Sequence, residues 1–332
     1  MNTTLLNFWY AVEHIAALGS SPQQVTLFDT NYILYRDANG LAKAALDRCP
    51  HRGSSFKKGW MEAGCLRCPY HGWQFDGQGR CTEIPADQPG VPIPAKARLQ
   101  LLPVVEKSGF VWIFPGDPMA ADAGLIPDFP ELNQPGWRPV SGEYEWDANF
   151  SRVVESGLDT SHAPFVHKNF FSNRDDAAIH PLEIKEETRS VSCWVEVKPP
   201  RVRGFFKIFL KKKERRYATT WLTSFAPNLN RMDFDLNMKG YRFVYFSSNI
   251  PVSANKTLTK WIEVRNFATT PLADSQFIKD TVHTYLEDKQ VIETQEPGLT
   301  WELSHPELLL ASDHLILAYR KKMASLLHHS AG

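Results

Sequence analysis

The sequence predicts an α+β protein: an all-β module comes first, and an antiparallel sheet with flanking helices follows. Residues 1–116 contain short runs of β-branched and aromatic residues between turn signals, such as Tyr32–Tyr35 and Phe110–Phe114. Residues 180–267 alternate between apolar and polar side chains, and helical patterns lie on either side of them. A chain of 332 residues is long enough for about two domains.

The composition argues against several classes of protein. Lys and Arg together number 37, as do Asp and Glu, so the formal net charge is zero and nothing global favours nucleic acid or a charged membrane surface. No apolar stretch approaches the ~18 residues of a membrane span, and the N-terminus lacks the pattern of a signal peptide. We therefore expect a cytoplasmic protein. Five cysteines, four of them between residues 49 and 81, are more typical of a metal site than of a disulfide framework.

Composition shifts divide the chain into a β module over residues 1–116, a linker over 117–140 and a second domain over 141–332. The linker is rich in Pro, Asp and Gly and has no periodicity. In the second domain we expect a first strand over Glu143–Trp146 and a helical stretch from about residue 149 to 162. Further strands are expected over the ranges 190–198, 241–249 and 258–266, and helices over the ranges 271–295 and 306–327.

A first metal motif lies in the β module, where Cys49-Pro-His51 is followed after sixteen residues by Cys68-Pro-Tyr70-His71. Each loop supplies one Cys and one His, whereas zinc fingers usually place like ligands together. A Rieske [2Fe–2S] cluster needs this mixed arrangement, because one iron takes two thiolates and the other two imidazoles. Cys65 and Cys81 are expected to pack as small hydrophobic residues.

Two positions beside the ligands distinguish this motif from that of respiratory-chain Rieske proteins. Those proteins join the two loops by a disulfide, but here Ser54 and Tyr70 stand where its cysteines would fall. The change favours a lower-potential centre of the oxygenase or ferredoxin kind. The Tyr70 hydroxyl is placed to donate a hydrogen bond to a sulfur of the cluster or its ligands, which would tune the potential.

A second metal motif begins the second domain. Asp159 and His162 are three residues apart and are expected to share a helix face. Pro164 is expected to end that helix, so that the chain folds back and directs His167 to the same point. Two histidines and one carboxylate on one face of Fe(II) leave positions open for dioxygen and substrate.

With both motifs present, the chain resembles the oxygenase (alpha) component of the Rieske non-haem iron oxygenases over nearly its whole length. Its size and the opening Asn7–Tyr10 are similar to the compact homotrimeric monooxygenases, the vanillate and dicamba O-demethylases and the saxitoxin-pathway hydroxylases. The resemblance implies a Rieske domain followed by a helix-grip catalytic domain. It also implies that His162 and His167 bind the mononuclear iron.

In the family the residue matching Asp159 bridges the ligand His162 to the cluster-binding His71 of the partner subunit. Members usually have Asn or Asp three residues earlier, and this chain has Ser156 there. The third iron ligand of the family matches Asp288, with Glu293 as the alternative. Asp288 belongs to a mostly apolar helical stripe, and a carboxylate there is costly unless it is paired or metal-bound. The stripe consists of Phe277, Thr281, Tyr285, Asp288 and Ile292.

The implied reaction is reductive activation of dioxygen beside a small organic substrate, by hydroxylation or oxidative demethylation. The chain has no dinucleotide-binding fingerprint and no plant-type ferredoxin spacing, so electrons are expected from a separate NAD(P)H-dependent reductase, with or without a ferredoxin. A head-to-tail ring of three subunits would place one subunit's cluster beside the next subunit's iron. Aromatic residues offered as pocket lining are Phe205, Phe206, Trp221, Phe225, Tyr245 and Trp261.

Three alternatives remain at this point. The chain could be the alpha subunit of a ring-hydroxylating dioxygenase with a β partner. It could be a Rieske electron carrier without oxygenase activity, against which the second metal motif argues. It could be a chlorophyll-pathway oxygenase, although the tail ending in His328 and His329 is too short and polar for the membrane segment that such chains usually carry.

Overall fold

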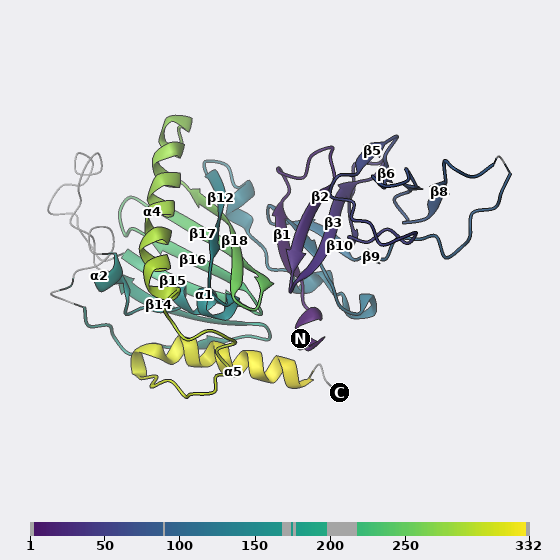
Figure 1. Ribbon diagram of the computed structural model, residues 1–332. Coiled ribbons are helices and arrows are strands. Elements are labelled where there is room, and N and C mark those ends of the chain that lie inside the picture. The colour runs from purple at the N-terminus through teal and green to yellow at the C-terminus, as the bar shows by residue number, and fades with distance from the viewer. Residues whose placement is uncertain (1–2, 89, 168–173, 175–176, 198–217, 330–332) are drawn as a thin grey trace. The chain divides into compact units, whose positions relative to one another are not determined.

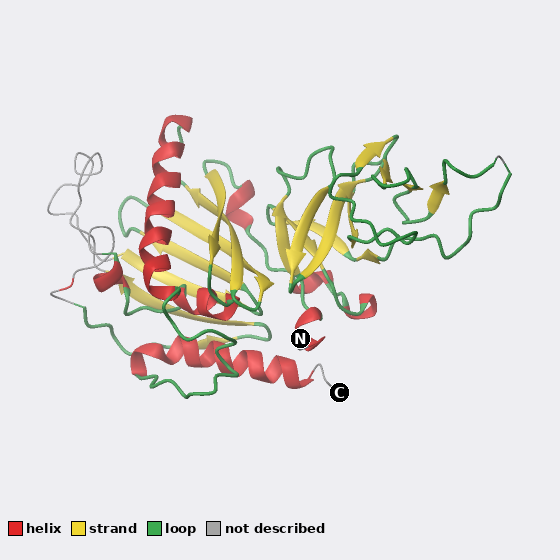
Figure 2. Ribbon diagram, viewed as in Figure 1, coloured by secondary structure: helices red, strands yellow, loops and turns green. Residues whose placement is uncertain are grey.

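The computed structural model describes residues 3–88, 90–167, 174, 177–197 and 218–329. The chain divides into two units, Met1–Asp128 and Phe129–Gly332. The first unit is built of antiparallel strands and short 3-10 helices, and the second combines one large sheet with three longer helical segments (Figures 1 and 2). The predicted α+β fold is confirmed. None of the helices in the described residues combines the length and hydrophobicity that a membrane span requires.

Three antiparallel sheets make up the first unit. One has the strand order β1 (Tyr10–His14), β11 (Phe110–Ile113), β10 (Val104–Lys107). The second has the order β2 (Gln23–Leu27), β3 (Thr30–Arg36), β4 (Ala42–Leu46), β9 (Leu101–Leu102). The third has the order β5 (Trp60–Glu62), β6 (Cys65–Arg67), β7 (Gln74–Phe75), β8 (Cys81–Glu83). The first loop of the first motif lies between β4 and β5, and the second loop connects β6 to β7.

The second unit is organised around a seven-stranded antiparallel sheet. Its strand order is β12 (Arg138–Trp146), β18 (Lys256–Arg265), β17 (Arg242–Ser253), β16 (Leu229–Asp235), β15 (Ala218–Phe225), β14 (Ser190–Val197), β13 (Lys185–Glu186). The predicted alternation in β14 is confirmed, because Val191, Cys193 and Val195 are buried while Trp194 and Glu196 are exposed. The expected strands over 241–249 and 258–266 correspond to β17 and β18.

Three α-helices lie against one face of this sheet: α1 (Phe150–Ser156), α4 (Asp274–Ile292) and α5 (His314–His329). A side-chain amide of β16 fixes α1, since Asn230 Nδ2 donates to the Val154 carbonyl at 2.8 Å. Thr281 of α4 donates to Glu263 of β18 at 2.8 Å. Directly paired residues of neighbouring strands point to the same face, so the strand register fixes which side chains meet the helices.

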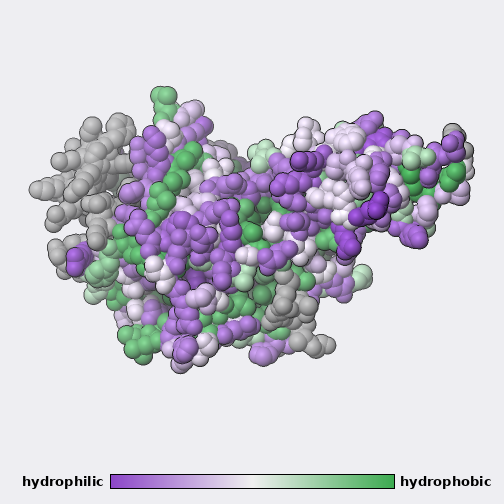
Figure 3. All heavy atoms as spheres, in the orientation of Figure 1, coloured by the Kyte–Doolittle hydropathy of each residue, from purple (hydrophilic) through white to green (hydrophobic). Residues whose placement is uncertain are grey.

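The bounds of several elements differ from those expected from the sequence. Residues 117–140, expected to be a linker, contain the 3-10 helices η2 (Pro118–Ala120), η3 (Ala123–Leu125) and η4 (Pro130–Asn133) and the first residues of β12. The last helix starts at His314 rather than near residue 306, after the short η7 (Ala311–Asp313). The long helix α4 follows η6 (Pro271–Ala273) and ends at Ile292, close to the predicted bounds. Its outward face mixes hydrophilic side chains with a run of hydrophobic ones, and Ile278, Leu286 and Val291 are exposed (Figure 3).

Candidate metal centres

The two loops of the first motif share one backbone pattern. In the first loop, Gly53 N–H donates to the Cys49 carbonyl at 2.9 Å and Cys49 N–H to the Ser54 carbonyl at 2.8 Å. In the second, Gly72 N–H donates to the Cys68 carbonyl at 3.0 Å and Cys68 N–H to the Trp73 carbonyl at 2.9 Å. Both glycines have positive φ, +76° and +70°, which a residue with a Cβ rarely adopts. The sequence spacing thus encodes two equivalent turns.

These turns place the cysteine side chains in the interior of the first unit and the histidine side chains at its surface. Cys49 and Cys68 are 2% exposed and belong to a core cluster with Phe56, Leu66 and Phe75. His51 and His71 are exposed, and their ring centroids lie 4.7 Å apart. Burial raises the pKa of the Cys49 thiol to about 12, so the positive charge of a metal centre is needed to hold this residue as a thiolate.

The same four side chains are too widely spread for a single metal ion. Among the described residues, no three ligand atoms of this set lie within 4.8 Å of one another, whereas the second motif does form such a group. Thiols and imidazoles are instead grouped by kind, with the Cys49 and Cys68 side chains in contact and the two histidines side by side. This grouping fits a two-iron cluster with thiolates on one iron and imidazoles on the other better than it fits zinc.

Aromatic rings cover both histidines. Trp73 stacks on His51 with centroids 4.6 Å apart and planes 4° apart. Tyr70 stacks on His71 with centroids 3.8 Å apart, and Tyr70 itself is 58% exposed. The proposed bond from the Tyr70 hydroxyl to a sulfur stays a prediction. The stacking of Trp73 was not expected from the sequence, although its place directly after Gly72 was the available signal.

The second motif does not lie on one continuous helix, and that expectation was wrong. Helix α1 ends at Ser156, and the four-residue α2 (Ala163–Val166) begins after a turn. Asp159 makes the turn, because its Oδ1 accepts the backbone N–H of Ser161 at 2.7 Å and that of His162 at 3.2 Å. Pro164 lies in the first turn of α2, where backbone N–H groups have no partner within the helix. The missing N–H of proline therefore costs no hydrogen bond there, and Pro164 lies at the start of a helix rather than at its end.

Helix α4 brings the third residue of the site into place. Its Tyr285 stacks on Tyr144 of β12 with centroids 3.8 Å apart, and the Tyr285 hydroxyl donates to the Glu145 carbonyl. Lys289 Nζ donates to the same carbonyl at 2.7 Å. Trp146, Val153, Tyr285 and Ile292 form a buried cluster that joins β12, α1 and α4. Asp288 is thereby held opposite the segment that follows α1.

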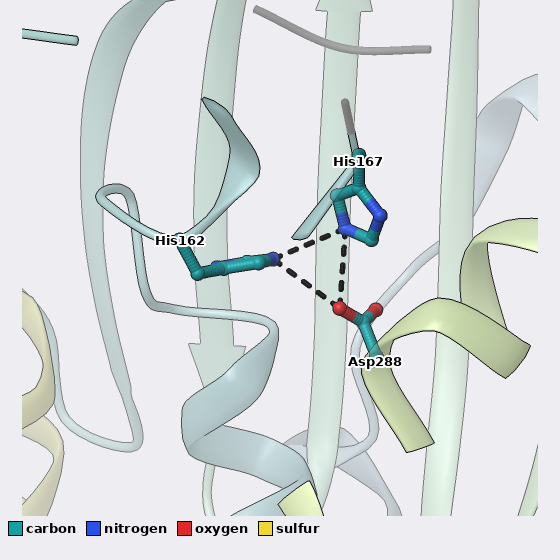
Figure 4. Close-up of side chains that lie close together, drawn as sticks. All are labelled: His162, His167 and Asp288. Atoms are coloured by element: carbon teal, nitrogen blue, oxygen red, sulfur yellow. Dashed lines mark hydrogen bonds and ion pairs between the residues drawn. The ribbon is translucent and has the colours of Figure 1, made fainter. Parts of the chain in front are cut away.

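Three side chains converge on one point (Figure 4). His162 Nε2 and His167 Nε2 lie 3.2 Å apart, and Asp288 Oδ1 lies 3.4 Å from the first and 3.1 Å from the second. Metal bonds of roughly 2.0–2.2 Å put neighbouring ligand atoms about 3 Å apart, so the triangle has the size of one face of a metal's coordination shell. Among the described residues this is the one such group of three.

The electrostatics of this point favour a positive charge. Burial by itself would lower the pKa of His162, but the Asp159 and Asp288 carboxylates outweigh it and raise that pKa to about 10. Burial would likewise raise the pKa of Asp288, and the two histidines lower it instead. Two carboxylates in a partly buried site are thus compensated either by a protonated imidazole or by a metal cation.

Each histidine also has a carboxylate behind it. Asp159 Oδ2 lies 3.6 Å from His162 Nδ1, an ion-pair distance that is long for a hydrogen bond. Glu287 Oε2 accepts a hydrogen bond from His167 Nδ1 at 3.0 Å. Both rings therefore turn Nε2 toward the shared point. The sequence interpretation assigned no role to Glu287, and its position directly before Asp288 was the only signal.

The other candidates lie elsewhere. Glu293, the alternative third ligand, accepts the Asp147 backbone N–H at 2.6 Å and pairs with Lys289. Of the aromatic residues offered as pocket lining, Tyr245 and Trp261 are on the helix face of the sheet. Trp221 and Phe225 alternate along β15 with the residues that face the helices, so they point to the other face of the sheet. On that face Trp221 helps to line a cavity of about 470 Å³. Phe205 and Phe206 fall outside the described residues.

Comparison with protein families matches both halves of the chain. Residues 8–105 match the Rieske [2Fe-2S] domain. Residues 146–329, more than half of the chain, match the vanillate O-demethylase oxygenase C-terminal domain. The two metal motifs fall one in each match.

Relatives with assigned activities match half or nearly all of the chain. Dicamba O-demethylase, oxygenase component, from Stenotrophomonas maltophilia is 39% identical over 50% of this chain, but that match spans only 48% of the relative's length. Methylxanthine N1-demethylase NdmA from Pseudomonas putida is 28% identical over 97% of this chain and 89% of its own length. The crystal structure of dicamba monooxygenase bound to 3,6 dichlorosalicylic acid superposes with a TM-score of 0.84 at 25% identity, covering 99% of each chain.

Proposed function

The chain belongs to the Rieske non-haem iron oxygenases of the vanillate O-demethylase type, and on that premise we propose that it is a monooxygenase that hydroxylates or oxidatively demethylates a small organic molecule. The observation that supports this most is the convergence of His162, His167 and Asp288 in a chain that also carries the Rieske motif. Demethylating relatives support the second of the two reactions.

In this proposal Cys49, His51, Cys68 and His71 hold the [2Fe–2S] cluster, and His162, His167 and Asp288 hold a mononuclear iron. When bound, the two centres supply single electrons and a place for dioxygen beside the substrate. The protein holds the geometry. Helix α4 fixes Asp288 through Tyr285 and Lys289. The turn made by Asp159 positions His162, and α2 sets the spacing between the two histidines.

Three donors on one side of the site leave the other side open for reactants. Near Asp288, on the helix face of the sheet, the hydroxyls of Tyr144 and Tyr245 are hydrogen-bonded to each other. Burial raises the pKa of both hydroxyls, so both stay neutral and can orient a polar substrate group without adding charge.

Electrons have to come from another protein in this proposal. We propose a separate NAD(P)H-dependent reductase, with or without a ferredoxin, because the chain has neither a dinucleotide-binding fingerprint nor a second iron–sulfur motif. Purified protein mixed with NADH, dioxygen and substrate should give no product until such a reductase is added. Turnover without it would contradict the proposal.

We also propose a head-to-tail homotrimer in which Asp159 links His162 to His71 of the partner subunit. The side chain of Asp159 is 29% exposed and uses one oxygen for its own turn, so the second oxygen is available to such a contact. Light scattering should give three times the chain mass of 37.8 kDa. The cytoplasmic location expected from composition stays a prediction.

Metal content and product analysis test the central proposal. Protein loaded with iron and sulfide should hold three irons per chain, two of them with acid-labile sulfide. Two irons would support an electron carrier instead. A screen of aromatic ethers, N-methylated heterocycles and phenylpropanoids with a surrogate reductase, read by mass spectrometry under ¹⁸O₂, should yield a hydroxylated or demethylated product. Incorporation of two oxygen atoms into a cis-diol would favour the dioxygenase alternative.

A further inference from the structure

The His167 ring is held between two adjacent residues of α4. Its Nε2 lies 3.1 Å from Asp288 Oδ1, and its Nδ1 lies 3.0 Å from Glu287 Oε2. Consecutive residues of a helix point about 100° apart, so the helix presents one carboxylate to each nitrogen of the same imidazole. The ring is 3% exposed, so these contacts are made in a largely desolvated place.

His167 lies at the end of a short helix. It is the C-terminal cap of α2, a helix of only four residues whose first turn has no side-chain cap. The Asp159 turn sets His162 directly but reaches His167 only through α2. The contact from α4, a longer helix that is anchored to β12, therefore constrains the direction of this ring.

We propose that Glu287 is a positioning residue that fixes the tautomer and direction of His167 for the mononuclear metal. A carboxylate that accepts the Nδ1 proton leaves the Nε2 lone pair pointing at the metal and makes it a stronger donor. Asp159 occupies the equivalent position beside His162. The distance from the carboxylate oxygen to Nδ1 of the ring is 3.0 Å for Glu287 and His167 and 3.6 Å for Asp159 and His162. This inference rests on the metal site of the proposed function.

A variant of His283, which contacts the second carboxylate oxygen of Glu287, provides a matched control. Its Oε1 lies 3.5 Å from Nε2 of His283, a residue of the same helix whose side chain is 58% exposed. Replacing His283 by Ala removes this outer contact and leaves the bond to His167 in place. A variant of Glu293, which is bonded to Asp147 and Lys289, controls for loss of a carboxylate from α4.

The test measures metal binding rather than turnover. Holoprotein is stripped of its mononuclear metal with a mild chelator, its cluster absorbance is checked, and it is titrated with Co(II), whose ligand-field bands report coordination. We expect Glu287→Ala to weaken binding by roughly 10- to 100-fold and to shift the bands, because the ring is free to turn. His283→Ala and Glu293→Gln should bind with affinity and spectrum close to those of the unaltered protein.

A conservative variant separates orientation from folding. Glu287→Gln retains an oxygen that can accept a hydrogen bond from Nδ1 of His167. Its spectrum should therefore stay near that of the unaltered protein, while its affinity for Co(II) should fall between those of the unaltered protein and Glu287→Ala. The inference is overturned if Glu287→Ala binds Co(II) as His283→Ala does. The metal site itself is wrong if His167→Ala also binds normally, so the two failures are distinguishable.

Discussion

Asp288 Oδ1 lies 3.1 Å from His167 Nε2, although His167 caps α2, Asp288 belongs to α4, and strands β13 to β18 lie between them in the sequence. Their meeting depends on the anchoring of α4 to β12 through Tyr285 and Lys289 and on the turn made by Asp159. The site is therefore a property of how α1, α2 and α4 are held on one sheet.

Removing any side chain of this triangle should empty the mononuclear site selectively. For His162→Ala, His167→Ala or Asp288→Ala we expect two irons per chain in place of three and no product, because two remaining donors hold Fe(II) weakly. The visible absorbance of the cluster should persist, since its ligands belong to the other unit. Iron and sulfide analysis measures both. Retention of three irons in Asp288→Ala would reopen the identity of the third ligand.

A substitution in the first motif should remove the cluster and leave the mononuclear metal bound. Cys68→Ser should abolish the visible absorbance, since a serine oxygen replaces a thiolate on the two-cysteine iron. Cys81→Ser is the matched control, because the Cys81 sulfur lies 3.4 Å from the Glu83 carbonyl and a hydroxyl can keep that contact. Equal loss of absorbance in both variants would mean that the fold, not the cluster, is being lost.

Asp159→Asn should separate the two centres. The amide removes the negative charge beside His162 but keeps an oxygen for the Ser161 turn. We expect both metals to remain and product formation to fall roughly 10- to 100-fold, the usual effect of changing a residue behind a metal ligand. Rapid-mixing spectroscopy of the reduced enzyme with dioxygen and substrate should show slower reoxidation of the cluster. An unchanged rate would reject the inter-subunit bridge.

Glu263 should make stability fall as pH rises. Burial raises its pKa from 4.5, the value expected in the unfolded chain, to about 7, because desolvation outweighs the Thr281 hydrogen bond and the charge of Arg265. The native state thus binds more protons between these values, and stability is lost as pH rises through that window. At 1.36 kcal/mol per unit the loss is on the order of 3 kcal/mol. Denaturation at pH 4 and pH 8 should show this loss in the unaltered protein and a smaller one in Glu263→Gln.

The ion pair of Arg320 with Glu155 should stabilise the second unit. Two bonds of 2.7 Å join them, and the side chains are 14% and 7% exposed. Arg320→Met leaves Glu155 buried without its main partner, which costs about 3 kcal/mol or more. Lys321→Met, next along α5 and exposed, should cost far less. Urea denaturation followed by circular dichroism compares them, and equal midpoints would contradict the prediction.

The sequence alone determined the features that depend on local spacing. Each Rieske loop carries its Cys, His and Gly within five residues, and a turn of that length has few solutions, so the two loops were readable as a pair. The α+β class followed from strand alternation, and the choice of Asp288 over Glu293 followed from a helical stripe together with the family resemblance.

The tertiary structure decided what depends on contacts between distant segments. Only the packing of α4 on the sheet shows that Glu287 lies behind His167 and that Glu293 is engaged by Asp147. Asp159 was expected on a helix, but its side chain binds backbone N–H groups more effectively in a turn, which spacing alone does not reveal. Which aromatic residues lie on the helix face of the sheet depended on the strand register relative to the helices, and an alternating sequence does not say which of its faces the helices will cover.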